Sequence, residues 1–386
     1  MISFMIVAFD WIIIALGAYF FCLATINALW MGKETRRAEL TDGPLVSVLV
    51  PARDEEEHIV PCIESLMHQT YKNYEVLVLD DNSTDKTREL LNKLQALYPD
   101  KLKVFPGKAL PEDWRGKGFA MKQLCGKAKG EYWLFTDADT VHSSSSVSLA
   151  ITNLLYHKVD FLSGYITQKT KTFGEKATVP SLYLLSGFIL PLWVCKWGKS
   201  PALAVAIGQY ICVKSASFMA CGGFDLVKDK TTEDVFLARA MKKHGYKTIF
   251  LNLKDAAMCR MYTSWQSCVN GISKNIFDFM NKNNIILVLA VIGVLIFLAL
   301  PPFLTIGLSI YSLLTAKAFT FTLAALWINM LLVGGTWVIV FTTQGINWKH
   351  AFIYPLIFVN ILYIAFISWR RSVFKKGYEW KGRMVY

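Results

Sequence analysis

The sequence predicts an α/β domain built on a parallel sheet, with transmembrane helices at both of its ends. The chain has 386 residues, of which 54% are hydrophobic, and its mean hydropathy is +0.35. This composition is too apolar for a soluble protein of that length. The long apolar runs lie near the two ends, and the roughly 250 residues between them suffice for one globular domain with its own core.

Four apolar runs are long enough to cross about 30 Å of hydrocarbon. They cover residues 4–30, 285–314, 318–341 and 351–369. The first contains one charged residue, Asp10, and has neither a basic lead-in nor a small-residue cleavage site. We therefore expect residues 1–32 to be a retained anchor rather than a signal peptide. The other three runs predict transmembrane helices over residues 284–370.

The formal net charge of +12 is concentrated beside the apolar runs. The basic residues concerned are Lys33, Arg36, Arg37, Arg370, Arg371, Lys375, Lys376, Lys381 and Arg383. The positive-inside rule and anionic headgroups explain this distribution, so we expect a membrane partner, a basic cytosolic tail over residues 371–386, and no nucleic acid. The eight cysteines include no C-x-x-C pair, which predicts reduced thiols rather than a zinc site or a disulfide framework.

The globular segment begins with a predicted βαβ unit. Residues 46–50 read as a buried strand stopped by Pro51, residues 56–69 as a helix, and residues 75–79 as a second strand that ends on two aspartates. The next helix, residues 85–97, follows a stretch with good capping chemistry.

A third buried strand is predicted over residues 132–135, ending on Thr136 and Asp137. In open parallel sheets ligands bind beyond the carboxyl ends of the strands, so we expect all three acid-tipped ends to face one crevice. Residues 179–195 predict either a helix lying on the bilayer or a buried core helix. Residues 207–224 predict a pair of strands that ends in a glycine turn.

Asp137-Ala138-Asp139 is the most specific chemical signal in the chain. On an extended backbone both carboxylates point to the same side, and two hard oxygen donors beside a diphosphate suit Mg²⁺ or Mn²⁺. We expect Asp139 to bind the metal and Asp137 to contact the nucleotide. A D-x-D triplet also arises by chance, but its position after a buried strand favours the metal. His142 is a further candidate ligand, with a solvated turn histidine as the alternative.

The two upstream acid clusters are candidate nucleotide contacts. The backbone of Ala52 and the side chain of Arg53 follow the first strand and could flank a nucleobase; the alternative is a helix N-terminus that favours acidic residues. Asp81 follows the second strand and could accept hydrogen bonds from the nucleoside, while Asp85 caps the following helix.

Two further motifs complete the candidate site. Lys117 lies between glycines and could reach a phosphate, with a solvated loop as the alternative. Asp234 opens an amphipathic helix and could be the general base that deprotonates an acceptor hydroxyl. In the alternative interpretation Thr232 caps that helix and the acids complement its dipole. The order of the acid clusters favours the base, because it matches what a nucleotide-sugar glycosyltransferase needs.

These motifs resemble family 2 glycosyltransferases of the GT-A fold over residues 45–275. The resemblance rests on Val48–Glu56, Leu79–Asp85, Phe135–Asp139 and Thr232–Asp234. Within the family, the branch that contains diaponeurosporenoate glycosyltransferases of carotenoid pathways looks most similar, on the strength of Trp114–Gly118, Arg260–Tyr262 through Lys274, and Glu379–Arg383.

The resemblance implies an inverting transfer of a hexose from a UDP-sugar, UDP-glucose, to a membrane lipid such as a carotenoid or another glycolipid precursor. It also implies Asp81 on the nucleoside, Asp137 and Asp139 around the ribose, diphosphate and metal, and Asp234 as base. Processive synthases carry Q-x-x-R-W after this segment, and Trp265 here follows Thr263 and Ser264 instead.

Three alternatives remain open. They are a processive cell-surface polysaccharide synthase, a sugar nucleotidyltransferase and a non-enzymatic membrane scaffold. The nucleotidyltransferase would carry a G-x-G-T-R loop after the first strand, where Pro51 and Ala52 stand. The scaffold would carry broken acid clusters and ionisable residues within the apolar runs.

A cytosolic sugar donor places the domain in the cytoplasm, in a multi-pass protein of the cell membrane. Three further crossings would then put the basic tail outside, against the positive-inside rule. We expect the tail to be cytosolic, because one run is re-entrant or because residues 285–314 fold back at Pro301-Pro302 as two short segments.

Overall fold

The computed structural model describes residues 2–230, 232–280, 282–316, 320–374, 378–380 and 383–385. Three lysines of the predicted basic tail, Lys375, Lys376 and Lys381, lie outside these residues. The chain forms two compact units. The sheet unit comprises Met31–Lys169 and Leu192–Met261, and the helix unit comprises Met1–Trp30, Thr170–Pro191 and Tyr262–Tyr386.

The sheet unit is built on a seven-stranded mixed sheet with the order β3-β2-β1-β4-β8-β6-β9. Its strands are β1 Val46–Ala52, β2 Tyr74–Asp80, β3 Leu102–Pro106, β4 Tyr132–Thr136, β6 Phe161–Tyr165, β8 Tyr210–Lys214 and β9 Thr248–Asn252. The three predicted strands, β2, β1 and β4, are parallel neighbours, and Ala52 pairs with Asp80 in the register. The carboxyl ends of these strands therefore lie at one edge of the sheet, as predicted.

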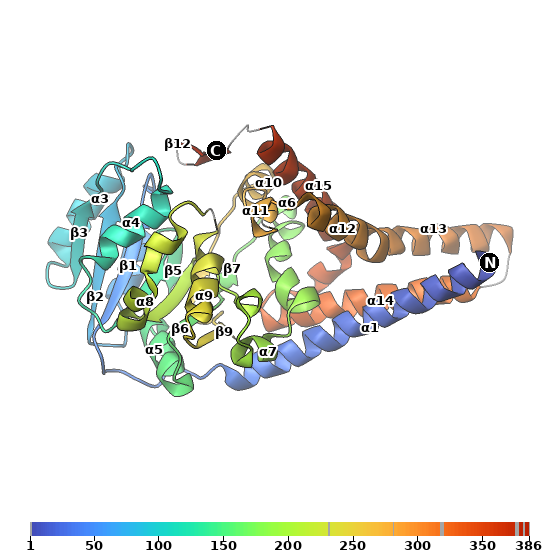
Figure 1. Cartoon of the computed structure of the whole chain (residues 1–386), viewed down its shortest axis with the longest axis horizontal. Helices are drawn as coiled ribbons and strands as arrows, with labels where there is room; N and C mark the ends of the chain where they lie inside the picture. The colour runs from blue at the N-terminus through green and yellow to red at the C-terminus, as the bar shows by residue number, and fades with distance from the viewer. Residues whose placement is uncertain are drawn as a thin grey trace. The chain divides into compact units, whose positions relative to one another are not determined.

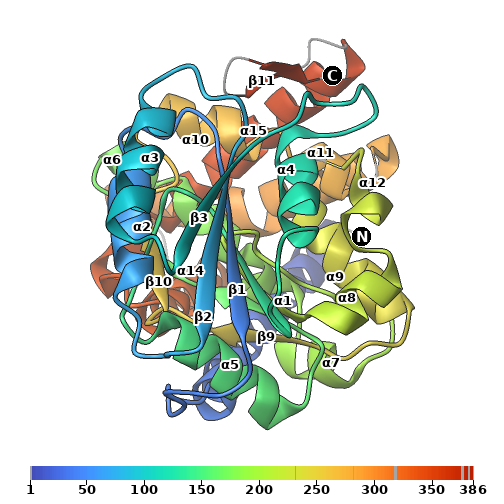
Figure 2. The same ribbon diagram turned by 90° about the vertical axis from the view of Figure 1, so that its left-hand side faces the viewer.

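Helices cover both faces of the sheet, as Figure 2 shows. On one face lie α2 (Ile59–Met67) and α3 (Thr87–Leu97), and on the other lie α4 (Gly116–Cys125), α8 (Ser215–Cys221) and α9 (Glu233–Lys243). The second face packs apolar side chains of β1, β4 and β8 against these three helices in one cluster. This three-layer arrangement holds the N-termini of α4 and α9 near the edge where β4 ends.

The predicted strand pair over residues 207–224 is wrong. Only β8 is a strand, and it lies antiparallel between β4 and β6. The chain then turns into α8, because Phe218 and Cys221 have helical spacing and bury one side of it. Gly222, with φ of 108°, ends this helix in the left-handed conformation that favours glycine.

A second, three-stranded sheet adjoins the D-x-D segment. It consists of β5 Thr140–His142, β10 Ala257–Cys259 and β7 Thr167–Gln168. Strand β5 begins immediately after Asp139 and is antiparallel to β10. The short helix α5 (Ser146–His157) follows β5 and returns the chain to β6.

The helix unit contains helices long and apolar enough to cross a membrane. Four such segments occur among the described residues: Phe4–Glu34, Asn284–Thr315, Phe321–Thr343 and Trp348–Val373. Helix α1 (Ile2–Glu34) lies beside α14 (Phe321–Thr343), as Figure 1 shows. Two polar contacts join them: the Asn329 amide donates to the Ile13 carbonyl at 2.7 Å, and the Thr322 hydroxyl donates to Asp10 at 2.9 Å.

Two predictions for this unit fail. Residues 284–315 form one continuous helical segment rather than two short segments folded back at Pro301-Pro302. A π-helical turn, Leu295–Ala299, directly precedes the prolines and widens the helix where hydrogen-bond donors are missing. Residues 179–195 do not form a single α-helix: a 3-10 turn over Val179–Tyr183 and a π-helical turn over Leu185–Ile189 end at Leu190 and Pro191, after which α7 (Leu192–Trp197) begins.

The contact between β6 and β9 tests this fold. Gly164 pairs with Leu251, and a β-carbon at Gly164 would overlap the Leu251 carbonyl oxygen. We expect Gly164→Ala to destabilise the protein by about 1–3 kcal/mol through overpacking. Gly126→Ala is the matched control, since its β-carbon would lie 3.5 Å from the nearest atom. Thermal unfolding of the purified full chain measures both, and equal midpoints would contradict the close strand contact.

Candidate active site

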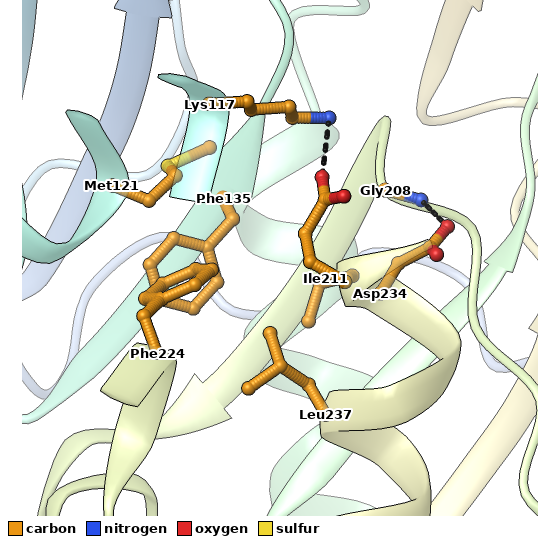
Figure 3. Close-up of a pocket in the computed structure, with 9 residues that line it drawn as sticks. Lys117, Met121, Phe135, Gly208, Ile211, Phe224, Asp234 and Leu237 are labelled. Carbon is orange, nitrogen blue, oxygen red and sulfur yellow. Dashed lines mark hydrogen bonds and ion pairs between the residues drawn. The ribbon is translucent and has the colours of Figure 1, made fainter. Parts of the chain in front are cut away.

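An ammonium group and two carboxylates meet at the carboxyl end of β4. The Nζ of Lys117 lies 2.7 Å from Oδ1 of Asp137 and 3.4 Å from Oε1 of Glu233. Figure 3 shows the Lys117 side chain reaching from α4 toward the start of α9. Lys117 lies in the first turn of α4, Asp137 directly follows β4, and Glu233 opens α9. Three elements that are distant in sequence thus converge on one cluster of charges.

Asp234 is held beside this cluster by backbone hydrogen bonds. Its Oδ2 accepts a hydrogen bond from the Gly208 N–H at 2.7 Å, and its Oδ1 accepts one from the Val235 N–H at 2.8 Å. Figure 3 shows the contact with Gly208. The loop that carries Gly208 is itself tied to β4, because the Thr136 hydroxyl donates to the Gln209 carbonyl at 3.0 Å. The orientation of Asp234 therefore depends on the loop before β8.

A small pocket lies over these residues. Its polar lining comes from Lys117, Glu233, Asp234 and the backbone of Gly208, and its apolar lining from Met121, Phe135, Ile211, Phe224 and Leu237. The apolar side lowers the local polarity around the carboxylates, so their charges interact more strongly than they would in water.

Burial governs the protonation of the two acids that open α9. Burial is the largest influence on Glu233, and together with the negative charges of Asp234 and Asp137 it raises the pKa of Glu233 to about 7 against the opposing charge of Lys117. Burial likewise raises the pKa of Asp234, again against Lys117 and the two backbone hydrogen bonds. Burial lowers the pKa of Lys117, but Asp137 and Glu233 more than reverse this and hold it above its usual value. The lysine therefore remains charged.

The D-x-D segment has a different geometry from the one predicted. It forms a turn, not an extended strand, in which the Thr140 N–H donates to the Asp137 carbonyl at 3.2 Å. Asp137 consequently contacts Lys117, whereas Asp139 accepts a hydrogen bond from the Thr140 hydroxyl at 3.3 Å and lies near the Cys259 thiol. Burial, followed by the charge of Asp137, raises the pKa of Asp139. The prediction that both carboxylates point to the same side because the backbone is extended is therefore wrong.

The loops after β1 and β2 are bound to each other. The Asp81 N–H donates to the Ala52 carbonyl at 2.7 Å. The Arg53 guanidinium donates to the carbonyl oxygens of Asp81 at 2.6 Å and of Asn82 at 3.1 Å. Three predicted nucleotide contacts, Ala52, Arg53 and Asp81, therefore lie together, and the side chain of Arg53 joins the two loops.

The remaining acids of these loops have structural partners. Asp54 accepts hydrogen bonds from the backbone N–H and hydroxyl of Thr84, and Asp85 accepts one from the Glu56 N–H at 3.0 Å. Asp85 also accepts a hydrogen bond from the Thr87 N–H at 2.9 Å, at the start of α3. Asp85 thus satisfies the first N–H of α3 from the position before the N-cap, Lys86.

His142 is neither a solvated turn residue nor placed as a metal ligand. It is buried, and its two ring nitrogens lie 3.0 Å from the Thr136 hydroxyl and 2.9 Å from the Ser146 hydroxyl. Burial lowers the pKa of His142 to about 3, so the ring is neutral. It links the end of β4 to the start of α5.

The donor atoms at this edge fit a divalent cation that arrives with a diphosphate. Among the described residues, no group of three or more His, Cys, Asp or Glu side chains is arranged to hold a metal alone. Mg²⁺ typically binds one or two carboxylates together with substrate phosphates rather than an all-protein cage. The contact of Asp137 with the Lys117 ammonium shows that this carboxylate already accommodates a cation.

Sequence reasoning missed two parts of the site. Gly208 and Gln209 lie in a loop with no motif, and their roles come from backbone groups that any residue type carries. Glu233 was visible only as the neighbour of Asp234. Its position next to an acid with a predicted role was the one signal that could have identified it.

Glu233 predicts a pH dependence of stability. Below about pH 4.5 the Glu233 carboxyl is protonated in both the folded and the unfolded chain. Between about pH 4.5 and 7 it stays protonated only in the folded protein, because folding raises its pKa. The free energy of unfolding therefore falls as the pH rises through this range. Glu233→Gln should remove this fall and raise the unfolding midpoint relative to the unmodified protein by about 2–4 °C at pH 8, with little change at pH 4.5. Glu112→Gln, at an exposed position, is the control. A constant offset at both pH values would contradict the assignment.

Part of the chain is similar to known glycosyltransferases. Residues 47–191 match the family model described as Glycosyl transferase family 2. The chain is 42% identical over 98 residues to the beta-monoglucosyldiacylglycerol synthase of Nostoc sp., covering 25% of this chain and 20% of that protein. It is 29% identical over 123 residues to the UDP-Glc:alpha-D-GlcNAc-diphosphoundecaprenol beta-1,3-glucosyltransferase WfgD of Escherichia coli, covering 32% and 46%.

A longer alignment and a solved structure extend the comparison. The probable glycosyltransferase YdaM of Bacillus subtilis is 25% identical over 219 residues, which cover 55% of this chain and 50% of YdaM. The chain thus spans from a fifth to a half of the length of these curated relatives. The mannosyltransferase PcManGT from Pyrobaculum calidifontis, solved with GDP-Man and Mn²⁺, superposes with a TM-score of 0.54 at 17% identity and covers 95% of this chain and 99% of its own. Residues 47–191 are therefore similar to glycosyl transferase family 2, and the chain has a GT-A-like α/β fold.

Proposed function

We propose that this protein is an inverting hexosyltransferase of the cell membrane that transfers glucose from UDP-glucose to a lipid acceptor. The observation that carries the proposal is the cluster of Lys117, Asp137, Glu233 and Asp234 at the carboxyl edge of a parallel sheet. The family match supports the reaction class. Two relatives named for glucosyl transfer, one to diacylglycerol and one to an undecaprenol-linked acceptor, support glucose and a lipid.

The donor would lie across the ends of β1, β2 and β4. In this proposal Asp81 accepts hydrogen bonds from the nucleoside, beside the backbone of Ala52 and Arg53, which lie together at this edge. Asp137 and Lys117 face the diphosphate, and Asp139 binds Mg²⁺ or Mn²⁺ with it. When bound, the metal would neutralise charge on the departing UDP.

The transfer is a single displacement. An acceptor oxygen attacks the anomeric carbon, the bond from that carbon to the UDP oxygen breaks, and its electron pair leaves with UDP. Asp234 takes the acceptor's proton. Its raised pKa and fixed carboxylate suit a general base, because both basicity and position contribute to proton transfer. A carotenoid carboxylate, the acceptor implied by the sequence resemblance, would bring no proton and would leave Asp234 an orienting role.

The membrane arrangement follows from the chemistry of the substrates. UDP-sugars are cytosolic, so the sheet unit faces the cytoplasm, and a lipid acceptor reaches the site from the bilayer. The four apolar helices supply the membrane attachment. We propose a multi-pass protein with residues 1–32 as its N-terminal anchor, residues 45–275 as the catalytic domain and residues 284–370 as C-terminal membrane helices. Residues 371–386 are then a basic cytosolic tail, which requires that one of the C-terminal runs is re-entrant, since residues 284–315 do not fold back.

Transfer of label from UDP-[¹⁴C]glucose to lipid by purified membranes tests the function. Asp234→Asn removes the base and should lower the rate at least about 100-fold, the usual contribution of general base catalysis. Asp139→Asn should abolish metal-dependent transfer to a similar extent. Both variants should still insert into the membrane, because neither residue lies in an apolar helix.

Asp225→Asn is the matched control. Asp225 is exposed and pairs with Lys122 outside the cluster, so its loss should leave transfer unchanged. Mass spectrometry of lipids from cells with and without the protein identifies the product. A water-soluble polymer as the labelled product, or full activity of Asp234→Asn on a hydroxyl acceptor, would contradict the proposal.

A further inference from the structure

The Lys117 ammonium contacts a carboxylate on the donor side of the proposed site and a carboxylate on its acceptor side. Lys117 contacts Asp137, which faces the donor diphosphate, and Glu233, which neighbours the base Asp234. The same ammonium also lies near Asp234. A β-carbon added at Gly208 would lie 3.0 Å from the Lys117 Nζ and 3.4 Å from Oδ2 of Asp234, so both groups border the same point. The donor side and the acceptor side of the site therefore use one cation.

The charges of this cluster do not balance without a second cation. Asp137, Glu233 and Asp234 can carry three negative charges, and among the described residues Lys117 is the cation that forms ion pairs with Asp137 and Glu233. The Lys117 side chain is 26% exposed and is carried on a four-carbon stem, so the ammonium is free to rotate toward an incoming ligand. A diphosphate is the ligand it would favour at this edge.

Lys117 and a divalent cation compete for the same pair of carboxylates, because the proposed metal ligand Asp139 lies two residues from Asp137, which Lys117 contacts. The ammonium lies 2.7 Å from Oδ1 of Asp137, a distance at which it occupies the space a metal would need. Two positive groups beside one pair of carboxylates repel each other. A metal held by Asp139 and the diphosphate therefore binds weakly while the lysine remains on Asp137.

We infer that Lys117 acts as an exchangeable cation, which pairs with Asp137 and Glu233 in the absence of donor and transfers to the donor diphosphate when it binds. This inference rests on the proposed function. It has two consequences. The site binds a metal weakly until a nucleotide diphosphate draws Lys117 away, and the Glu233–Asp234 pair loses its neutralising charge only once the donor is in place. Lys117 is thus a positioning residue that makes donor binding precede activation of the acceptor.

Metal binding without catalysis tests the exchange. Mn²⁺ is titrated into the purified full chain in detergent, without nucleotide and then with saturating UDP, and free Mn²⁺ is followed by electron paramagnetic resonance. Lys117→Met removes the charge and nearly preserves the length of the side chain. In the absence of UDP it should bind Mn²⁺ about tenfold more tightly than the unmodified protein, a factor that corresponds to ~1.4 kcal/mol. With UDP the advantage should disappear, because Lys117 then binds the diphosphate.

Two controls isolate the charge at this position. Lys117→Arg keeps the charge and should keep weak Mn²⁺ binding without UDP. Lys122→Met removes a lysine from the same helix that pairs with Asp225 on the surface, and it should leave Mn²⁺ binding unchanged in both conditions. Lys117→Gln gives a second neutral side chain, and the same tightening is expected if Lys117→Met does not fold.

The outcomes separate this inference from the proposed function. If the unmodified protein and the neutral variants bind Mn²⁺ equally without UDP, while Mn²⁺ and UDP still bind together, the exchange is wrong and the transferase assignment stands. If the unmodified protein binds no UDP with or without Mn²⁺, the proposed function itself fails. Tighter Mn²⁺ binding by the neutral variants that UDP abolishes supports the exchange.

Discussion

The compensation of buried carboxylates by one lysine is the constraint on which the site depends. Glu233 and Asp234 lie against an apolar wall, where ionised groups are costly to desolvate, and Asp137 adjoins them at the end of β4. Lys117 offsets part of this cost directly, and backbone N–H groups of Gly208 and Val235 offset part of it at Asp234. What remains uncompensated appears as the raised pKa of Glu233 and of Asp234. A site in this condition is poised to take up a cation or a proton.

Hydrogen bonds between loops, rather than additional charged side chains, hold the site in place. Backbone and side-chain hydrogen bonds join the loop after β1 to the loop after β2, through Arg53, Asp54 and Asp85. On the other side, Thr136 joins β4 to the loop before β8, and Asp234 joins that loop to α9. Acids that look functional in the sequence, such as Asp54 and Asp85, therefore hold these loops together. The acids left to face a ligand are fewer than the motifs suggest.

In the helix unit, polar side chains are likewise compensated by hydrogen bonds. Two polar side chains of its long helices bond across helices, Asn329 to the Ile13 carbonyl and Thr322 to Asp10, while hydroxyls such as that of Thr336 donate to carbonyls of their own helix. In a bilayer an unpaired polar group has no water to bind, so such contacts also select which helices lie together. The adjacent prolines of the second long segment are accommodated by a π-helical turn instead of by a reversal of the chain.

The sequence by itself determined the α/β class, the three strands that carry acids, the four apolar helices and the residues Lys117, Asp137 and Asp234 as candidates. These features follow from local periodicity, turn chemistry and the fixed side at which parallel strands end. Only the tertiary structure decided that the D-x-D segment is a turn, that residues 215–221 are a helix, and that Lys117 pairs with Asp137 and Glu233. The ion pairs of Lys117 join residues about 20 and 116 positions apart, strand β5 after the D-x-D turn pairs with the distant β10, and Phe218 of the helix packs on Phe135. No local pattern in the chain encodes the free energies of such contacts.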